Sequence, residues 1–96
     1  MNPIFKSNGI YIGFIISNLL YSRDGEYLGW VEDNFVWDSR GRFRGRIWND
    51  KYVISNKFAV APIPRVPRPI PPVPTLPTPP ANITPVLLPT GWDDAF

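Results

Sequence analysis

Apolar and polar positions recur in a unit of sixteen residues, and three copies of the unit follow one another without a gap. The units span residues 9–24, 25–40 and 41–56. Each contains a β-branched and aromatic run, an interruption with Asn or Asp, a second apolar run and a second polar turn. Short apolar runs bounded by such residues are typical of β-hairpins, because Asn, Asp and Gly adopt positive φ at low steric cost. The pattern therefore predicts two strands per unit and leaves no stretch long enough for a helix.

The predicted strands cover residues 10–16, 19–22, 27–32, 35–38, 43–48 and 51–54, with tight turns at 17–18, 33–34 and 49–50. Six of the seven glycines keep the same period: Gly9, Gly25 and Gly41 open the units, and Gly13, Gly29 and Gly45 follow four residues later. A regular period of this kind sets the architecture of the whole fold.

The segments on either side of the three units look like two halves of a fourth. Residues 2–8 match the second half of a unit, and residues 57–61 match the first half, with Ala61 at the position of the second glycine. We therefore expect the N-terminal strand to pair with residues 58–61 and to close a ring, since closure removes two exposed sheet edges. The expected fold is all-β, a small closed pseudo-fourfold ring of about eight short strands.

The two faces of the strands differ in how constant they are. One series reads aromatic, glycine, aliphatic in every unit and is predicted to form the core: Tyr11, Gly13, Ile15, Tyr27, Gly29, Val31, Phe43, Gly45 and Ile47. The other series changes from unit to unit and is predicted to face solvent. In the first unit it is Ile10, Ile12, Phe14 and Ile16. This patch is larger than a small monomer usually exposes, so we expect it to take part in assembly.

The chain resembles a bacterial family of small proteins, the four-fold β-flower domain. The resemblance is carried by the tandem G-x-Y-x-G-[FW]-[IV] units at residues 9–15 and 25–31, and by a long proline-rich tail that ends in Gly91-Trp92. MORN repeats and choline-binding repeats have similar aromatic and glycine units at longer periods. The third unit departs from the pattern, with Arg46 where Phe14 and Trp30 stand. The resemblance implies the ring fold and implies no activity.

Composition changes after Ala61, since twelve of the thirteen prolines lie between Pro62 and Pro89. Such density favours an extended polyproline II arm. The predicted organisation is thus a repeat β domain at 1–61 and an arm at 62–96. With three residues per turn, Ile70, Val73 and Leu76 form an apolar ridge. We expect this arm to dock on its own body or on a neighbouring subunit, through the residues Trp30, Trp37, Trp48, Arg68, Trp92 and Phe96.

Two other binding functions stay open from the sequence. Residues 68–74 satisfy the R-x-x-P-x-x-P pattern of SH3 ligands, so the arm could instead be offered to a separate protein. Arg42, Arg44 and Arg46 alternate along one strand and could hold nucleic-acid phosphates beside Trp48. The net charge of +2 is too small to require a polyanionic partner. We therefore do not expect nucleic acid to be the ligand.

The sequence contains few of the residue types that usually act in catalysis. The chain has no His and no Cys, which removes the usual general base, the best nucleophile and the usual zinc ligands. We expect no catalytic residues, no cofactor and no metal site. No run approaches the ~18 apolar residues of a membrane span, and the N-terminal apolar run lacks an A-x-A site, so a cytoplasmic location is expected. The predicted function is a non-catalytic structural or assembly module.

Overall fold

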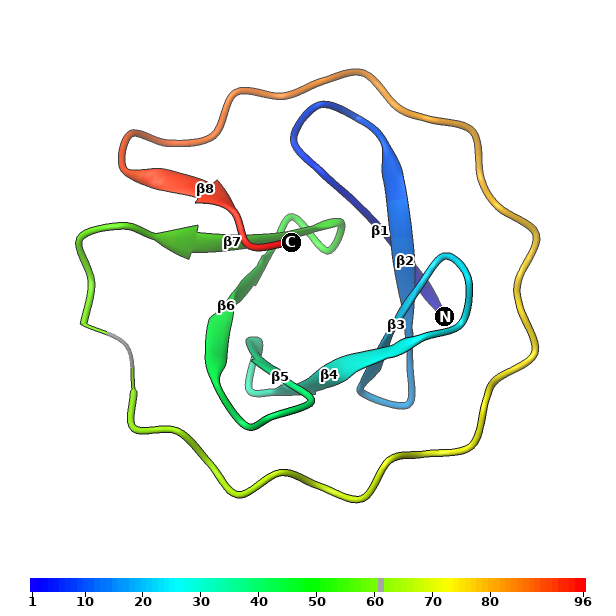
Figure 1. Ribbon diagram of the computed structural model, residues 1–96. Coiled ribbons are helices and arrows are strands. Elements are labelled where there is room, and N and C mark those ends of the chain that lie inside the picture. Colours follow the sequence, from blue (N-terminus) through cyan, green and yellow to red (C-terminus); the bar gives the residue numbers. More distant parts are fainter. Residues whose placement is uncertain (61) are drawn as a thin grey trace.

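The structure, a computed structural model, describes residues 1–60 and 62–96. Its elements are all strands, and they form one sheet in which neighbours in sequence are neighbours in space (Figure 1). They are β1 (Asn2–Phe5), β2 (Tyr11–Ile16), β3 (Leu19–Ser22), β4 (Tyr27–Glu32), β5 (Phe35–Asp38), β6 (Phe43–Trp48), β7 (Tyr52–Asn56) and β8 (Trp92–Asp94). The first seven close into a ring through β1 and β7, which run parallel and pair at Phe5 and Tyr52. The predicted closed all-β ring is confirmed.

The tight turns form where the polar pairs predicted them. Both residues of each pair have positive φ: 50° and 61° at Ser17 and Asn18, and 52° and 67° at Asp33 and Asn34. Two successive residues with positive φ produce a turn whose twist matches that of the flanking strands. The third hairpin differs, because Lys51 joins its turn and β7 begins at Tyr52. Its pairing therefore shifts by one residue relative to the other two hairpins.

The fourth unit is completed by a different segment from the one that we predicted. Residues 58–60 form no strand, and Ala61 lies outside the described residues. The strand that takes the place of residues 58–61 is β8, which pairs antiparallel with β7 and places Asp94 opposite Ile54. Gly91 and Ala95 repeat the four-residue spacing of Gly9 and Gly13, and the φ of Gly91 is 89° against 88° at Gly9. The first half of the fourth unit thus comes from residues 91–96, and the proline-rich segment is inserted between the third unit and the fourth.

The centre of the ring is formed by the second strand of each unit. Ile4, Leu20, Val36 and Val53 are buried together, one from each quarter of the ring. The predicted core residues Ile15, Val31 and Ile47 pack against this cluster but are themselves only partly buried. Tyr11 is buried, whereas Tyr27 and Phe43 are half-buried. The sequence analysis therefore missed the four residues at the axis itself.

The prediction that the variable series faces solvent is wrong at its aromatic positions. Phe14 and Trp30 are 0% and 1% exposed, and Trp37 on the neighbouring strand is also buried. Phe14 stacks on Tyr21, with ring centroids 5.4 Å apart, and the guanidinium of Arg68 lies over Trp30. Ile10 and Ile16 stay exposed, so the predicted patch is interrupted by a buried residue. Both faces of these strands are covered, one by the ring centre and the other by neighbouring aromatics or the arm.

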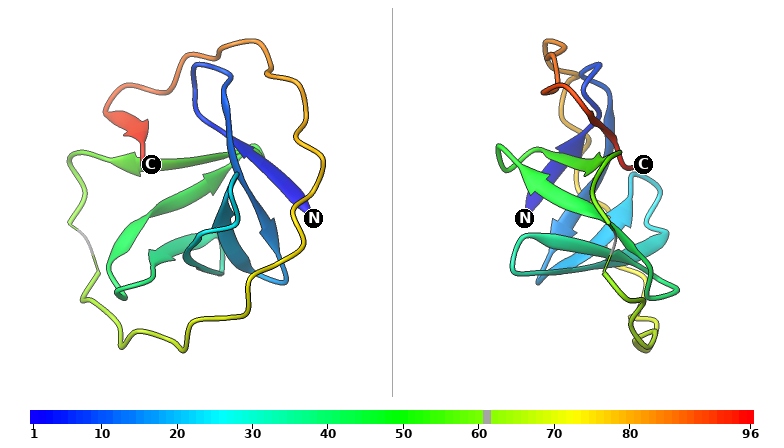
Figure 2. Two further views of the ribbon diagram at one scale, coloured as in Figure 1. Left: turned by 45° about the vertical axis from the view of Figure 1, so that its right-hand side comes forward. Right: turned by 90° about the vertical axis from the view of Figure 1, so that its left-hand side faces the viewer.

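The molecule is a flat disc of about 36 × 35 × 18 Å. Residues 62–90, which we call the belt, form no helix or strand and run around the outside of the strands before they return to β8 (Figures 1 and 2). Among residues 71–77 the half-buried positions are Pro71, Pro74 and Pro77. A period of three fits a polyproline II rod, and that conformation stays a prediction.

Candidate interaction surface

The belt is held at the corners where glycines open the repeat units. The amide of Arg65 donates to the carbonyl of Gly41 at 2.7 Å, and the amide of Ile83 donates to the carbonyl of Gly9 at 2.9 Å. Leu76 lies against Gly25, at a distance of 3.0 Å from where a Cβ would stand. A side chain at Gly9 or Gly41 would collide with the carbonyl oxygen of Ile83 or Arg65. These glycines therefore give the turn its positive φ and also let the belt approach the backbone.

Two arginines of the belt contact the stacked rings of Trp30 and Trp37 in the second unit. Arg65 and Arg68 both pair with the carboxylate of Glu32, and the Arg68 contact measures 2.8 Å. Their guanidinium groups lie over the rings of Trp37 and Trp30, at 5.0 and 4.6 Å from the ring centroids. The hydrogen bond from Arg65, followed by the charges of both arginines, lowers the pKa of Glu32. Charge and ring stacking thus hold the first third of the belt.

The last third of the belt rests on a second apolar cluster. Ile83 and Leu88 pack against Phe5, Tyr11, Tyr52 and Ile54, together with Trp48 and Trp92. Beside them the amide of Val86 donates to the carbonyl of Ser7 at 2.8 Å, and the amide of Tyr11 donates to the side-chain oxygen of Asn82. At the end of β8, Asp94 accepts hydrogen bonds from the amide and the hydroxyl of Ser7. This end of the belt therefore joins the ring closure to the fourth unit.

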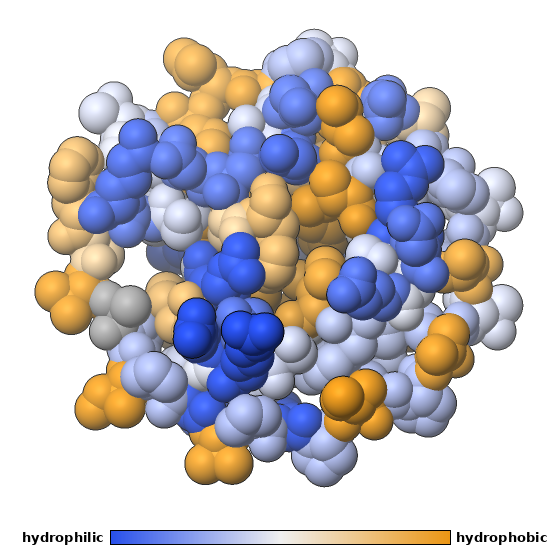
Figure 3. Space-filling view, in the orientation of Figure 1, coloured by the Kyte–Doolittle hydropathy of each residue, from blue (hydrophilic) through white to orange (hydrophobic). Residues whose placement is uncertain are grey.

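The aliphatic ridge that was predicted to dock faces outward instead. Ile70 and Val73 are 79% and 85% exposed, and Leu76 is half exposed. Figure 3 shows apolar side chains around the rim of the disc. They belong to the same exposed group, which in the belt comprises Ile63, Val66, Ile70, Val73, Leu76, Val86 and Leu87. In a rod with three residues per turn, Ile70, Val73 and Leu76 lie along one edge, and Pro71, Pro74 and Pro77 lie along another. The proline edge is the half-buried one.

The SH3-type pattern is engaged within the chain. Its three defining residues are Arg68, Pro71 and Pro74. Arg68 is bound to Glu32 and stacked on Trp30, and both prolines are half-buried. An SH3-type groove requires the arginine and both prolines to be accessible on one side. This arrangement therefore opposes recognition of the folded chain through that motif.

The three arginines predicted to share one strand face do not form a row of equivalent groups, because β6 begins at Phe43 and Arg42 precedes it. Arg44 is held by the carbonyl of Ala95 and lies over the ring of Phe96, with Asp38 at 3.8 Å. Arg42 and Arg46 are exposed. Trp92 and Phe96, predicted as anchors of the far end, are half-buried in and beside β8. Arg44 thus has a structural contact that fastens the last residues of the chain to the ring.

Two polar atoms of the second unit are buried without a hydrogen-bond partner among the described residues, the hydroxyl of Tyr27 and the indole nitrogen of Trp30. Burial raises the pKa of Tyr27, while the charge of Arg68 opposes this rise. No group of three or more His, Cys, Asp or Glu side chains within 1–60 and 62–96 is placed to hold a metal ion. The same residues include no helix that is long and apolar enough to cross a membrane.

Comparison with known proteins gives one match. Neither the curated proteins nor the solved structures contain a match to this chain. The family model described as "4-fold beta flower protein" matches residues 1–95, which includes the belt and β8 as well as the three regular units. The matched range agrees with a ring whose fourth quarter is completed by the last residues of the chain. The chain belongs to the 4-fold beta flower family.

Proposed function

We propose that this chain is a non-catalytic assembly module, a β ring wrapped by its own proline-rich belt. The observation that carries the proposal is the division of the belt into two edges. Farther along the belt, Leu76, Ile83 and Leu88 do contact the ring. In the first half of the belt, however, Arg65 and Arg68 contact the ring and Pro71 and Pro74 are half-buried, whereas the large aliphatic side chains are exposed: Ile63, Val66, Ile70 and Val73. A belt that served only to cover the body would place its aliphatic residues inward, since their burial contributes most to stability. Outward placement supports contact with another molecule.

The partner that we propose is a second copy of the chain. Ile63, Val66, Ile70 and Val73 follow one another along one sector of the rim, and each is at least 79% exposed. Contact with another molecule would remove these large aliphatic side chains from water, which is favourable. Two discs that meet edge to edge at this sector would cover it on both copies, as the twofold symmetry of most dimers requires. A different protein with an apolar groove is the alternative occupant.

The oligomeric mass tests this proposal. Light scattering during size-exclusion chromatography should give a mass above that of one chain, and replacing Ile70 and Val73 with Ser should return the mass to the monomer. A matched variant, Thr75→Ala with Thr78→Ala, changes the same belt segment without removing an aliphatic group, and it should assemble like the parent. A parent that is monomeric at all concentrations up to about 100 μM would refute self-assembly and favour a separate protein partner.

A further inference from the structure

The third unit lacks an aromatic ring that the first two units possess. The residue after the second glycine is Phe14 in the first unit and Trp30 in the second, and both rings stack on an aromatic residue of the next strand. Trp30 and Trp37 lie nearly parallel, with centroids 6.4 Å apart and planes 15° apart. Arg46 takes this position in the third unit, and the residue opposite is Ile54. The stacked pair is therefore absent from this quarter of the ring.

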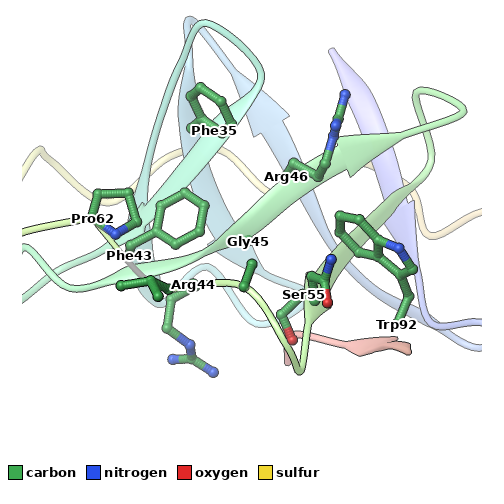
Figure 4. Close-up of a pocket in the computed structure, with 11 residues that line it drawn as sticks. Phe35, Phe43, Arg44, Gly45, Arg46, Ser55, Pro62 and Trp92 are labelled. Atoms are coloured by element: carbon green, nitrogen blue, oxygen red, sulfur yellow. The ribbon is translucent and has the colours of Figure 1, made fainter. Parts of the chain in front are cut away.

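A cavity of about 330 Å³ lies at this place. Figure 4 shows Phe35 and Phe43 on one side, Trp92 on the other, and Gly45 between them. Phe35 and Phe43 meet edge to face, with centroids 5.7 Å apart. Phe35 is 46% exposed, which is unusual for an aromatic residue in a small protein. The walls thus offer aromatic surface on both sides of the cavity.

The charge around the cavity is positive. Arg44 and Arg46 line it, and no carboxylate side chain does so among the described residues. Arg44 is bound to Ala95 and Asp38, whereas Arg46 is in no ion pair within the part of the chain that the structure describes. Ser55 and Asn56 also line the cavity. Arg46 is therefore the cation that an anion at this cavity would meet.

We propose that this cavity binds a small planar aromatic anion. The ring of the ligand takes the place that Phe14 and Trp30 fill in the other units, against Phe43 and Trp92, and its acid group pairs with Arg46. Ligand sites combine apolar walls with a few placed polar groups in this way, and aromatic pairs add about 0.5–1.5 kcal/mol beyond their area. A carboxylate, a sulfonate or a phosphate would satisfy the same guanidinium. This site goes beyond the proposed assembly function and does not depend on it.

Titration of the full-length chain with 2-naphthoate tests the proposal, followed by the NMR shifts of the Gly45 amide and the Trp92 indole N–H. Two further probes separate the parts of the ligand: 2-naphthol keeps the rings without the charge, and cyclohexanecarboxylate keeps the charge without the rings. 2-Naphthalenesulfonate and phenyl phosphate distinguish the acid groups. We expect 2-naphthoate to bind at least roughly tenfold more tightly than either 2-naphthol or cyclohexanecarboxylate.

Three variants make the test specific. Arg46→Gln should weaken 2-naphthoate roughly tenfold or more, because it removes the cation and keeps the space. Arg46→Trp should abolish binding by restoring the ring of the other units, and it should raise the melting temperature of the chain. Arg42→Gln, immediately before the same strand and outside the cavity lining, should bind like the parent.

Absence of any shift at about 5 mM 2-naphthoate would overturn the proposal. So would equal binding of 2-naphthoate by Arg46→Gln and the parent, or shifts that spread over the rim instead of Gly45 and Trp92. If Arg46→Trp does not fold, the Arg46→Gln comparison decides the question alone.

Discussion

At the scale of single residues, the repeated glycines are required for two different reasons, positive φ at one position of the unit and lack of space for a Cβ at the other. Gly9, Gly25 and Gly41 have φ near +85°, a conformation that L side chains rarely adopt. Gly13 and Gly29 have no such requirement and are needed for space. In each case the obstacle is a backbone carbonyl of the next strand, which cannot move aside like a flexible side chain. The sequence analysis placed these glycines in the predicted core, and they are buried.

Replacing Gly29 with Ala should therefore be severely destabilising. A Cβ at this position would collide with the carbonyl oxygen of Trp37 and lie 2.8 Å from the Cα of Asp38. We expect a loss above the ordinary range of ~0.5–3 kcal/mol for single changes, measured by urea unfolding. Asp24→Ala, at an exposed turn, is the control and should change stability by less than about 0.5 kcal/mol. A midpoint for Gly29→Ala equal to that of the parent would contradict the packing described.

Glu32 makes the docking of the belt dependent on pH. The arginines of the belt lower the pKa of Glu32 in the folded chain below its ordinary value of 4.5. The stabilisation is therefore complete above pH 4.5 and is lost as the pH falls through the lower folded pKa. We expect hydrogen exchange at the Arg65 amide to accelerate below about pH 4, relative to the intrinsic rate. In Glu32→Gln the exchange should be faster at neutral pH, and the acid step should disappear. An unchanged acid step in that variant would assign it to another group.

At the scale of elements, the hairpins with local turns could be predicted from the sequence. The pairing of the C-terminal strand β8 with β7 could not. Strands at residues 19–22, 27–32, 35–38 and 43–48 have the predicted bounds, since their turns are specified by adjacent residues. β8 was missed because Asp93 stands where the other units have Tyr or Phe, and Asp94 stands where the first two have Ile or Leu. The local signals were the spacing of Gly91 and Ala95 and the aromatic residue Phe96 at the position of Phe14 and Trp30. The cavity beside Trp92 was also missed, because it depends on which segment completes the fourth unit.

Because the belt is an insertion, the ring should fold without it. The amide of Lys57 donates to the carbonyl of Gly91 at 2.9 Å, so the two ends of the insertion lie together. We expect a variant in which Arg-Asp replaces residues 56–90, so that Ser55 is joined to Gly91 as Ser22 is to Gly25, to keep the sheet and to melt at a lower temperature. A chain that ends at residue 60 lacks β8 as well and should lose hydrogen-exchange protection on β7. Equal protection of β7 in both variants would show that β8 is dispensable.

At the scale of the whole molecule, the faces of the ring strands could not be assigned from their own residues. Trp30 lies in a series that also contains Glu26 and Glu32, which is typical of a solvent-facing strand. Its burial depends on Arg68, which is distant in sequence. The sequence predicted that the arm docks on aromatic residues, and it left open whether these belong to its own body or to a neighbouring subunit. It could not predict which edge of the arm faces inward, because prolines and aliphatic residues are both apolar.

Hydrogen exchange along the belt distinguishes a docked belt from a free arm. Arg65, Ile83 and Val86 donate their amides to carbonyls of the body and should exchange at least roughly tenfold more slowly than Ile70 and Val73. Leu88→Ala should lower the stability by about 1–2 kcal/mol, since Leu88 is half-buried on the second cluster. Uniform random-coil exchange over residues 62–90 would exclude docking in the folded chain.

The completion of the fourth unit by a distant segment also makes that unit exchangeable between molecules. β8 reaches β7 through a long tether, so its effective concentration at its own ring falls as the tether is loosened. When that concentration drops below the concentration of whole chains, β8 of one molecule fills the fourth unit of another, with the same hydrogen bonds. This is the condition for a domain-swapped dimer. Refolding at high protein concentration, or after the belt arginines are removed, should therefore favour reciprocal exchange, and dilution of the unfolded chain should favour the self-wrapped disc.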